Sequence, residues 1–193
     1  MPYHVLVACG ALSSGTANTT VRTAYEKTAE QVLARLGISV ARCGGAGDRG
    51  IDLRGWWTLR PATSDAQDGG DGDVVARVRV ICQCKRLRGK LGPGPIRELA
   101  GVALREQAMG MLVSARGFGQ QAVREWRSSI APLVLVDLPA DSEHCTAIRW
   151  NDMAARQLKG LAVGRPAIQS AVASGVTLFI HGQPIAPASD TDM

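Results

Sequence analysis

The sequence predicts a single α/β domain in which a mixed central sheet is flanked by helices. Apolar residues recur at helical spacing in several segments, and short runs of β-branched or uniformly apolar residues lie between these segments. The order is helix, three strands, helix, strand, helix, strand, which implies an antiparallel start and a crossover to parallel strands. A chain of 193 residues fits one such domain with tails.

The N-terminal half predicts one helix and two strands. One apolar stripe at helical spacing lies within residues 20–36 and is formed by Tyr25, Ala29, Val32, Leu33 and Leu36. Gly37 follows this stripe and is a typical helix end. We expect strands at residues 38–42 and 51–59, with a glycine-rich turn between them.

An acidic loop and a long strand complete the first part of the sheet. Residues 61–73 contain four Asp and three Gly with almost no apolar side chain, which is typical of a solvated linker. The spacing of these acids matches no calcium-binding loop. Residues 74–87 are rich in β-branched residues. We therefore expect this strand to run antiparallel to the strand before the loop.

The C-terminal half continues the alternation of helices and strands. Pro93 and Pro95 suit the first turn of a helix, and its apolar stripe is formed by Ile96, Leu99, Ala100, Ala103 and Leu104. The later elements are expected as strands at residues 111–115, 133–138 and 147–150 and as helices at residues 120–128 and 152–161. The last ten residues predict a frayed tail.

These elements divide the chain into three parts. Residues 1–18 predict a tail or a targeting segment, residues 19–161 the folded domain, and residues 162–193 a C-terminal extension and tail. No apolar run reaches the roughly 20 residues that cross a membrane as a helix.

Charge and cysteine content restrict the function classes. The net charge is +5, and eight basic residues between positions 77 and 105 are opposed only by Glu98. They are Arg77, Arg79, Lys85, Arg86, Arg88, Lys90, Arg97 and Arg105. Such a patch suits a polyanion, and a solvated basic face is the alternative. Those expected to contact nucleic-acid phosphates are Arg86, Arg88, Lys90 and Arg97.

The five cysteines are an odd number without framework spacing, which favours a reducing compartment over a disulfide scaffold. Cys82 and Cys84 have no second pair that would complete a zinc site. We expect both to be buried strand residues.

Two short segments carry the candidate site, Gly50-Ile51-Asp52-Leu53 and Cys82-Gln83-Cys84-Lys85. Side chains alternate faces along a strand, so Gln83 and Lys85 share one face while Cys82 and Cys84 share the other. If the two strands pair, a carboxylate, an amide oxygen and an ammonium converge at one edge of a sheet. Such a set can hold a divalent cation and orient a water against a phosphodiester.

The chemical type of each residue in the candidate site suggests its role in metal binding or catalysis. We expect Asp52, Gln83 and the backbone carbonyl of Cys84 to bind Mg²⁺, with Mn²⁺ as an alternative ion. Lys85 would orient the attacking water and neutralise charge on the phosphate. Glu26 lies beside the apolar stripe of the first helix and would reach the metal or a metal-bound water. Because Gln83 stands where a second acid could, the site carries one negative charge less and favours a single ion.

Each of these residues also has an ordinary explanation as a strand-end Asp, an exposed Gln-x-Lys face or a solvated Glu. Their joint order, with glycines before the acid and the acid before Gln-x-Lys, is far more specific. Gly45, Gly47 and Gly50 also fit a dinucleotide-binding fingerprint. That motif must open a helix, whereas a strand pattern follows here, so we reject it. Asp137, after an apolar strand, is expected to be structural.

Residues 20–138 resemble the Mrr-like branch of the PD-(D/E)xK restriction-endonuclease superfamily. The resemblance is carried by Tyr25-Glu26, by Gly47-Asp48-Arg49-Gly50-Ile51-Asp52-Leu53, by the Gln-x-Lys variant in Gln83-Cys84-Lys85-Arg86, and by Ile96-Arg97-Glu98-Leu99-Ala100-Gly101. It implies a restriction-endonuclease-like αβββαβ core, a magnesium-dependent endodeoxyribonuclease activity and DNA as the partner, and it leaves a homodimer open.

Within that group, residues 50–57 and 97–99 resemble fungal mitochondrial proteins named for being required for respiratory growth. This resemblance implies a mitochondrial location and a role in genome maintenance. Superfamily members can lose catalysis, so a catalytically inactive nucleic-acid-binding module is the first alternative. An assembly protein whose basic face meets acidic partners is the second.

Overall fold

A computed structural model describes residues 14–43, 50–62, 74–164 and 175–189. The main sheet consists of β1 (Ile38–Arg42), β2 (Leu53–Leu59), β3 (Ala76–Lys85), β4 (Met109–Ser114), β5 (Leu133–Asp137) and β6 (Ala147–Trp150), in that spatial order. The helices are α1 (Ser14–Ala34), α2 (Pro93–Glu106), α3 (Gln120–Ser128) and α4 (Asp152–Ala155). A second sheet contains β7 (Leu161–Gly164), β8 (Thr177–Ile180) and β9 (Gln183–Pro184).

The main sheet is mixed, as the order of elements predicts. β2 runs antiparallel to both β1 and β3, β4 and β5 run parallel to β3, and β6 runs antiparallel to β5. Lys85 is in register with Ser114, and Ser114 is in register with Asp137. The carboxyl ends of the three parallel strands therefore meet at one edge, where open α/β sheets commonly bind ligands.

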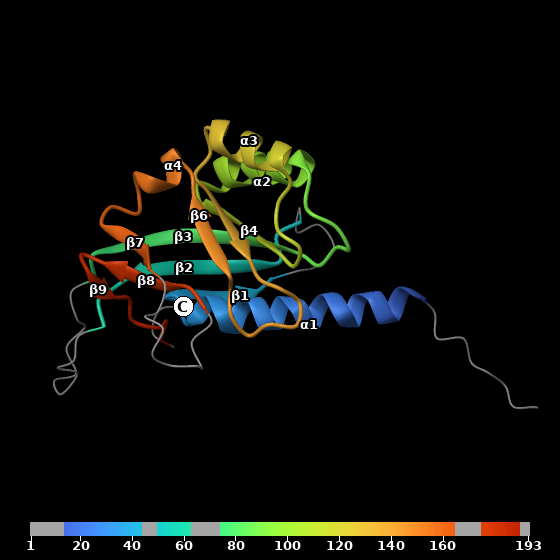
Figure 1. Ribbon diagram of the computed structural model, residues 1–193, viewed down its shortest axis with the longest axis horizontal. Coiled ribbons are helices and arrows are strands. Elements are labelled where there is room, and N and C mark those ends of the chain that lie inside the picture. Colours follow the sequence, from blue (N-terminus) through green and yellow to red (C-terminus); the bar gives the residue numbers. More distant parts are fainter. Residues whose placement is uncertain (1–13, 44–49, 63–73, 165–174, 190–193) are drawn as a thin grey trace, which may run out of the picture.

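Helices cover both faces of this sheet, with α1 on one side and α2 and α3 on the other (Figure 1). The layers follow from the alternation along β3. Cys82 and Cys84 pack with Tyr25 and Leu33 of α1, whereas Ile81 packs with Ile96 of α2. Both cysteines are buried, as predicted from the strand pattern.

Most predicted elements are confirmed, with β1, α3 and β6 at the predicted bounds. The helix predicted at residues 20–36 begins earlier, at Ser14. The helix predicted at residues 152–161 is wrong beyond Ala155, because Leu161 pairs with Ile180 in the second sheet after a left-handed turn at Gly160. The segment that follows Gly50 enters β2 and not a helix, which agrees with rejecting the dinucleotide fingerprint.

The C-terminal region differs most from the sequence prediction. The second sheet was not predicted, and residues 184–189 are not a frayed end. Ile185 is buried, and the Ala186 and Ala188 amides donate to the carbonyls of Arg60 and Ala34 at 2.8 and 2.7 Å. The terminal segment therefore closes over the end of α1.

Parts of the predicted tail, the glycine-rich turn and the acidic loop (residues 1–13, 44–49 and 63–73) lie outside the described residues. Across the part of the chain that is described, none of the helices has the length and apolarity needed to cross a bilayer.

Candidate active site at the end of strand β3

Asp52 is fixed by the backbone where the pairing of β2 and β3 ends. The last paired residues are Leu53 and Cys82, and the Asp52 amide still donates to the Cys82 carbonyl at 2.9 Å. Beyond this point no backbone carbonyl of β2 pairs with the Cys84 amide. The Asp52 side chain accepts this hydrogen bond instead, through Oδ2 at 2.7 Å. The residue is only 3% exposed. The strand geometry thus holds this carboxylate in one orientation.

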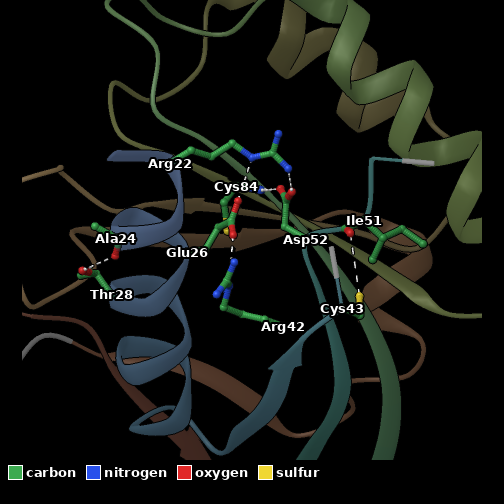
Figure 2. A network of polar contacts seen from close by, with 9 residues as sticks. All are labelled: Arg22, Ala24, Glu26, Thr28, Arg42, Cys43, Ile51, Asp52 and Cys84. Atoms are coloured by element: carbon green, nitrogen blue, oxygen red, sulfur yellow. Dashed lines mark hydrogen bonds and ion pairs between the residues drawn. The ribbon is translucent and has the colours of Figure 1, made fainter. Parts of the chain in front are cut away.

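Glu26 reaches the same place from α1 and is also 3% exposed. The two carboxylates are joined by Arg22, whose Nε donates to Glu26 Oε1 at 2.8 Å and whose terminal nitrogen donates to Asp52 Oδ1 at 2.9 Å. Arg42 of β1 donates to Glu26 Oε2 at 3.2 Å. Figure 2 shows the Arg22 guanidinium above the two carboxylates and Arg42 approaching Glu26 from below.

The charges in this cluster depend on one another. Burial raises the pKa of Asp52, the Cys84 amide opposes that rise, and the nearby Glu26 charge adds to it. Arg22 and Lys85 act in the opposite direction on the Asp52 pKa. The hydrogen bond to Glu26 and the charge of Asp52 raise the pKa of Arg22. Arg22, which contacts both acids, therefore favours the ionised form of Asp52.

Gln83 lies next to this cluster and is 5% exposed. Among the described residues its Oε1 is a buried atom without a hydrogen-bond partner, which is costly for an amide oxygen. Gly50 makes room for this side chain, since a Cβ at its left-handed φ of 78° would lie 2.7 Å from Gln83 Nε2. The Oε1 atom of Gln83 is therefore available to accept a hydrogen bond or to bind a cation.

Lys85 lines a cavity of about 320 Å³ together with Asp52 and Arg22. The remaining lining residues are Val21, Gly50, Cys84, Arg86 and Leu87. Glu26 and Gln83 lie outside this lining, so they border the site from below the surface. The structure thus brings Glu26, Asp52 and Lys85 to one place, with Gln83 beside them.

The donor set fits a hard divalent cation in kind, because carboxylate, amide and carbonyl oxygens are the ligands that Mg²⁺ prefers. Cys84 could contribute only its carbonyl, since its thiol packs in the α1 core and burial raises its pKa well above the ordinary value. The described residues contain no group of three or more His, Cys, Asp or Glu side chains able to hold a metal. A cation here would therefore depend on the unused Gln83 oxygen.

The basic residues do not form one continuous patch. Arg77 stacks on Trp56 and Arg79 contacts Glu106, and the two arginines lie about 26 and about 20 Å along β3 from Lys85. Arg97 lies on α2 and contacts Glu125 of α3 at 3.4 Å. The basic residues at positions 77–105 therefore do not lie together as one patch, because neighbouring acids and the length of β3 separate them.

Three of the predicted phosphate contacts lie in the loop after β3. Arg86, Arg88 and Lys90 are exposed there, and Arg86 lines the cavity that contains Asp52. Lys90 lines a neighbouring cavity of about 490 Å³ at the ends of β4 and β5. Its charged lining residues also include Arg116, Asp137 and Arg149. The C-terminal edge of the parallel strands is therefore lined with basic side chains.

Arg22 and Arg42 are the site residues that sequence reasoning missed. The position of Arg22 four residues before Glu26 on a predicted helix is a recognisable ion-pair spacing. The contacts of Arg22 with Asp52 and of Arg42 with Glu26 join residues 30 and 16 positions apart and arise only from the tertiary fold.

Comparisons with known proteins identify the family. A family model for the Mrr catalytic domain, described as a restriction endonuclease, matches residues 19–140. A protein of Schizosaccharomyces pombe named "Uncharacterized protein C824.03c, mitochondrial" is 27% identical over 153 residues, which are 77% of this chain. The match spans 58% of that curated relative.

Among solved structures, the MspJI restriction endonuclease in complex with a 27-mer oligonucleotide is similar at 20% identity. The match covers 70% of this chain and 32% of that one, with a TM-score of 0.42.

Proposed function

The chain belongs to the Mrr-type restriction endonuclease family, and from this premise we propose that it is a metal-dependent endonuclease that hydrolyses DNA phosphodiester bonds. One observation carries the proposal. Glu26, Asp52 and Lys85 come from three different elements and converge at the end of β3, where a cavity opens beside them. A structural ion pair alone would not require a lysine and an unused amide oxygen at the same place.

The residues of the site divide the work of hydrolysis between them. Asp52, Gln83 and the Cys84 carbonyl would hold Mg²⁺, which when bound offsets phosphate charge and makes a coordinated water more acidic. Lys85 faces the cavity and would orient the attacking water and neutralise the charge that builds on the phosphate oxygens. Glu26 would hold water in place from its buried position on α1.

The experiment that tests this proposal is a nuclease assay of Lys85→Ala beside wild type across a magnesium titration. The variant should lose about a hundredfold or more in cleavage rate, the usual effect of removing one electrostatic stabiliser. Lys159→Ala is the matched control, because Lys159 is an exposed lysine in the turn before β7. Equal cleavage by wild type and Lys85→Ala would contradict the proposal.

The surface around the cavity supports DNA as the substrate. Arg86 and Lys90 both lie in the loop after β3, and they line different cavities near the ends of the parallel strands. Basic side chains spaced along an edge can follow the phosphates of one strand.

A second function is favoured by the neutral Gln83 and by the arginines that already neutralise both acids. On this alternative the protein binds nucleic acid through the nuclease scaffold without turnover. It predicts salt-sensitive binding of duplex, single-stranded or branched DNA with no cleavage at any magnesium concentration. Metal-dependent product formation with any of these substrates would exclude it.

We further propose a mitochondrial location with a role in genome maintenance. The support is the printed name of the Schizosaccharomyces pombe relative and the resemblance of residues 50–57 to fungal mitochondrial proteins. Organelle fractionation of cells that express the tagged chain tests the location, and a signal confined to other fractions would contradict it.

A further inference from the structure

The position between the two acids of the site is held by an arginine side chain of this chain itself. Arg22 contacts one oxygen of Glu26 and one of Asp52, at 2.8 and 2.9 Å (Figure 2). A divalent cation bound to Asp52, with one of its water ligands held by Glu26, would need the same carboxylate oxygens and the same space. The guanidinium and the cation are therefore expected to exclude one another.

The four carboxylate oxygens are held in two different ways. Asp52 Oδ2 is bound by the backbone amide of Cys84, and Glu26 Oε2 is bound by Arg42 of β1. These partners belong to the sheet and orient the acids. The other two oxygens, Asp52 Oδ1 and Glu26 Oε1, both receive their hydrogen bonds from Arg22. Removing Arg22 would free these two oxygens and leave both acids oriented by their partners in the sheet.

Arg22 is also the member of this cluster that can leave most easily. Its side chain is 62% exposed, whereas the side chains of Glu26 and Asp52 are 5% and 4% exposed. Ion pairs with an exposed partner add little net stability, because water and salt compete for that partner. Arg22 lines the same cavity as Lys85 and Arg86, so a phosphate bound there would offer its guanidinium a bidentate acceptor.

We propose that Arg22 is the resident counter-ion of the cation site: it holds Glu26 and Asp52 in the free protein and transfers to a DNA phosphate when the cation binds. This inference rests on the proposed function. It makes cation binding and DNA binding cooperative. A bound DNA phosphate draws Arg22 away from the acids and so opens the cation site, and a bound cation displaces Arg22 and so frees it to contact a phosphate. By linkage, DNA must tighten cation binding by the same factor by which the cation tightens DNA binding.

The test measures Mn²⁺ binding to the folded, DNA-free protein by electron paramagnetic resonance, so cleavage is not needed. Arg22→Gln should bind Mn²⁺ about tenfold or more tightly than wild type, because a positive charge has left the site. Arg22→Lys should fall between the two, since it keeps the charge but loses the planar fork. Arg35→Gln is the matched control, because it makes the same charge change just past the C-terminal end of α1, about 20 Å from Arg22. Equal Mn²⁺ affinity in Arg22→Gln and wild type overturns the inference.

A second measurement uses wild type, which keeps the test decisive if Arg22→Gln does not fold. A DNA duplex, checked by gel to stay intact during the measurement, should tighten Mn²⁺ binding to wild type. It should tighten binding to a folded Arg22→Gln or Arg22→Lys variant by a smaller factor. An Mn²⁺ affinity of wild type that ignores DNA overturns the inference. Tighter Mn²⁺ binding by Arg22→Gln without any cleavage by wild type supports the inference and removes only the hydrolysis proposed above.

Discussion

Two aspartates at the same edge of the central sheet invite comparison. Asp52 lies before β2 and Asp137 ends β5, burial raises the pKa of each, and each contacts an arginine. Asp52 shares its arginine with Glu26, whereas Asp137 is paired with Arg149 at 2.7 Å. Among the described residues that line the second cavity, Asp137 is the only acid.

Because the pKa is raised at both aspartates, a raised pKa alone does not tell the proposed active site from an ion pair. At Asp137 one acid meets one arginine, and the pair is close to neutral. The Asp52 cluster contains two acids, and Arg22 and Arg42 both contact Glu26. Lys85 adds a further positive charge in the cavity. A cation could replace an arginine beside the acids, and a phosphate could bind the positive groups. We therefore expect the second acid to distinguish the proposed active site from the ion pair at Asp137.

The largest expected effect separates the two aspartates directly. Asp52→Asn should lower metal-dependent DNA cleavage by about a thousandfold or more, because it removes the only carboxylate fixed by β3 next to Lys85. Asp137→Asn should keep most of the wild-type rate. Single-turnover cleavage assays at saturating Mg²⁺ measure both. Similar losses in the two variants would show that the second cavity also takes part in the reaction.

The next effect compares the glycines that lie against the two sites. Gly50 and Gly117 both have a left-handed φ, of 78° and 71°, so alanine at either position should cost about 1–2 kcal/mol of stability. Gly50→Ala also places a Cβ 2.7 Å from Gln83 Nε2, whereas the contact at Gly117 is 3.1 Å from Asp137 Oδ1. Chemical denaturation should show similar stability losses. Only Gly50→Ala should also weaken Mn²⁺ binding, and unchanged Mn²⁺ binding would remove Gln83 from the ligand set.

In stability, by contrast, the two aspartates should behave alike. The folded-state pKa of each is raised above its ordinary value of 3.8, so the folded protein binds protons more readily than the unfolded chain. The resulting stabilisation is fully present below that ordinary value and is lost as pH rises through the folded-state pKa. Asp52→Asn and Asp137→Asn should therefore raise Tm at neutral pH. This gain should disappear in acid, and a gain that stays constant with pH would contradict the assignment.

Local sequence patterns predicted the elements of the main sheet and the faces of β3. They did not predict the features that depend on tertiary contacts. Alternation along one strand correctly separated Gln83 from Cys84, because strand geometry alone determines which face a side chain occupies. Arg22 could be paired with Glu26 by helical spacing, but its contact with Asp52 depends on how α1 packs against β3. The second sheet was missed for the same reason, since Leu161 becomes a strand residue only through its partner Ile180.

The smallest effect concerns the basic residues around the two cavities. Arg86→Gln and Lys90→Gln should each weaken DNA binding a few-fold and reduce the slope of log K against log salt by about one. Arg97 was predicted from the sequence to do the same, but its side chain contacts Glu125 on the outer helices. Arg97→Gln should therefore leave the slope close to that of wild type. Each lost phosphate contact reduces the number of counterions released on binding by a similar amount. An equal reduction of the slope in all three variants would therefore indicate that DNA also contacts Arg97 on α2.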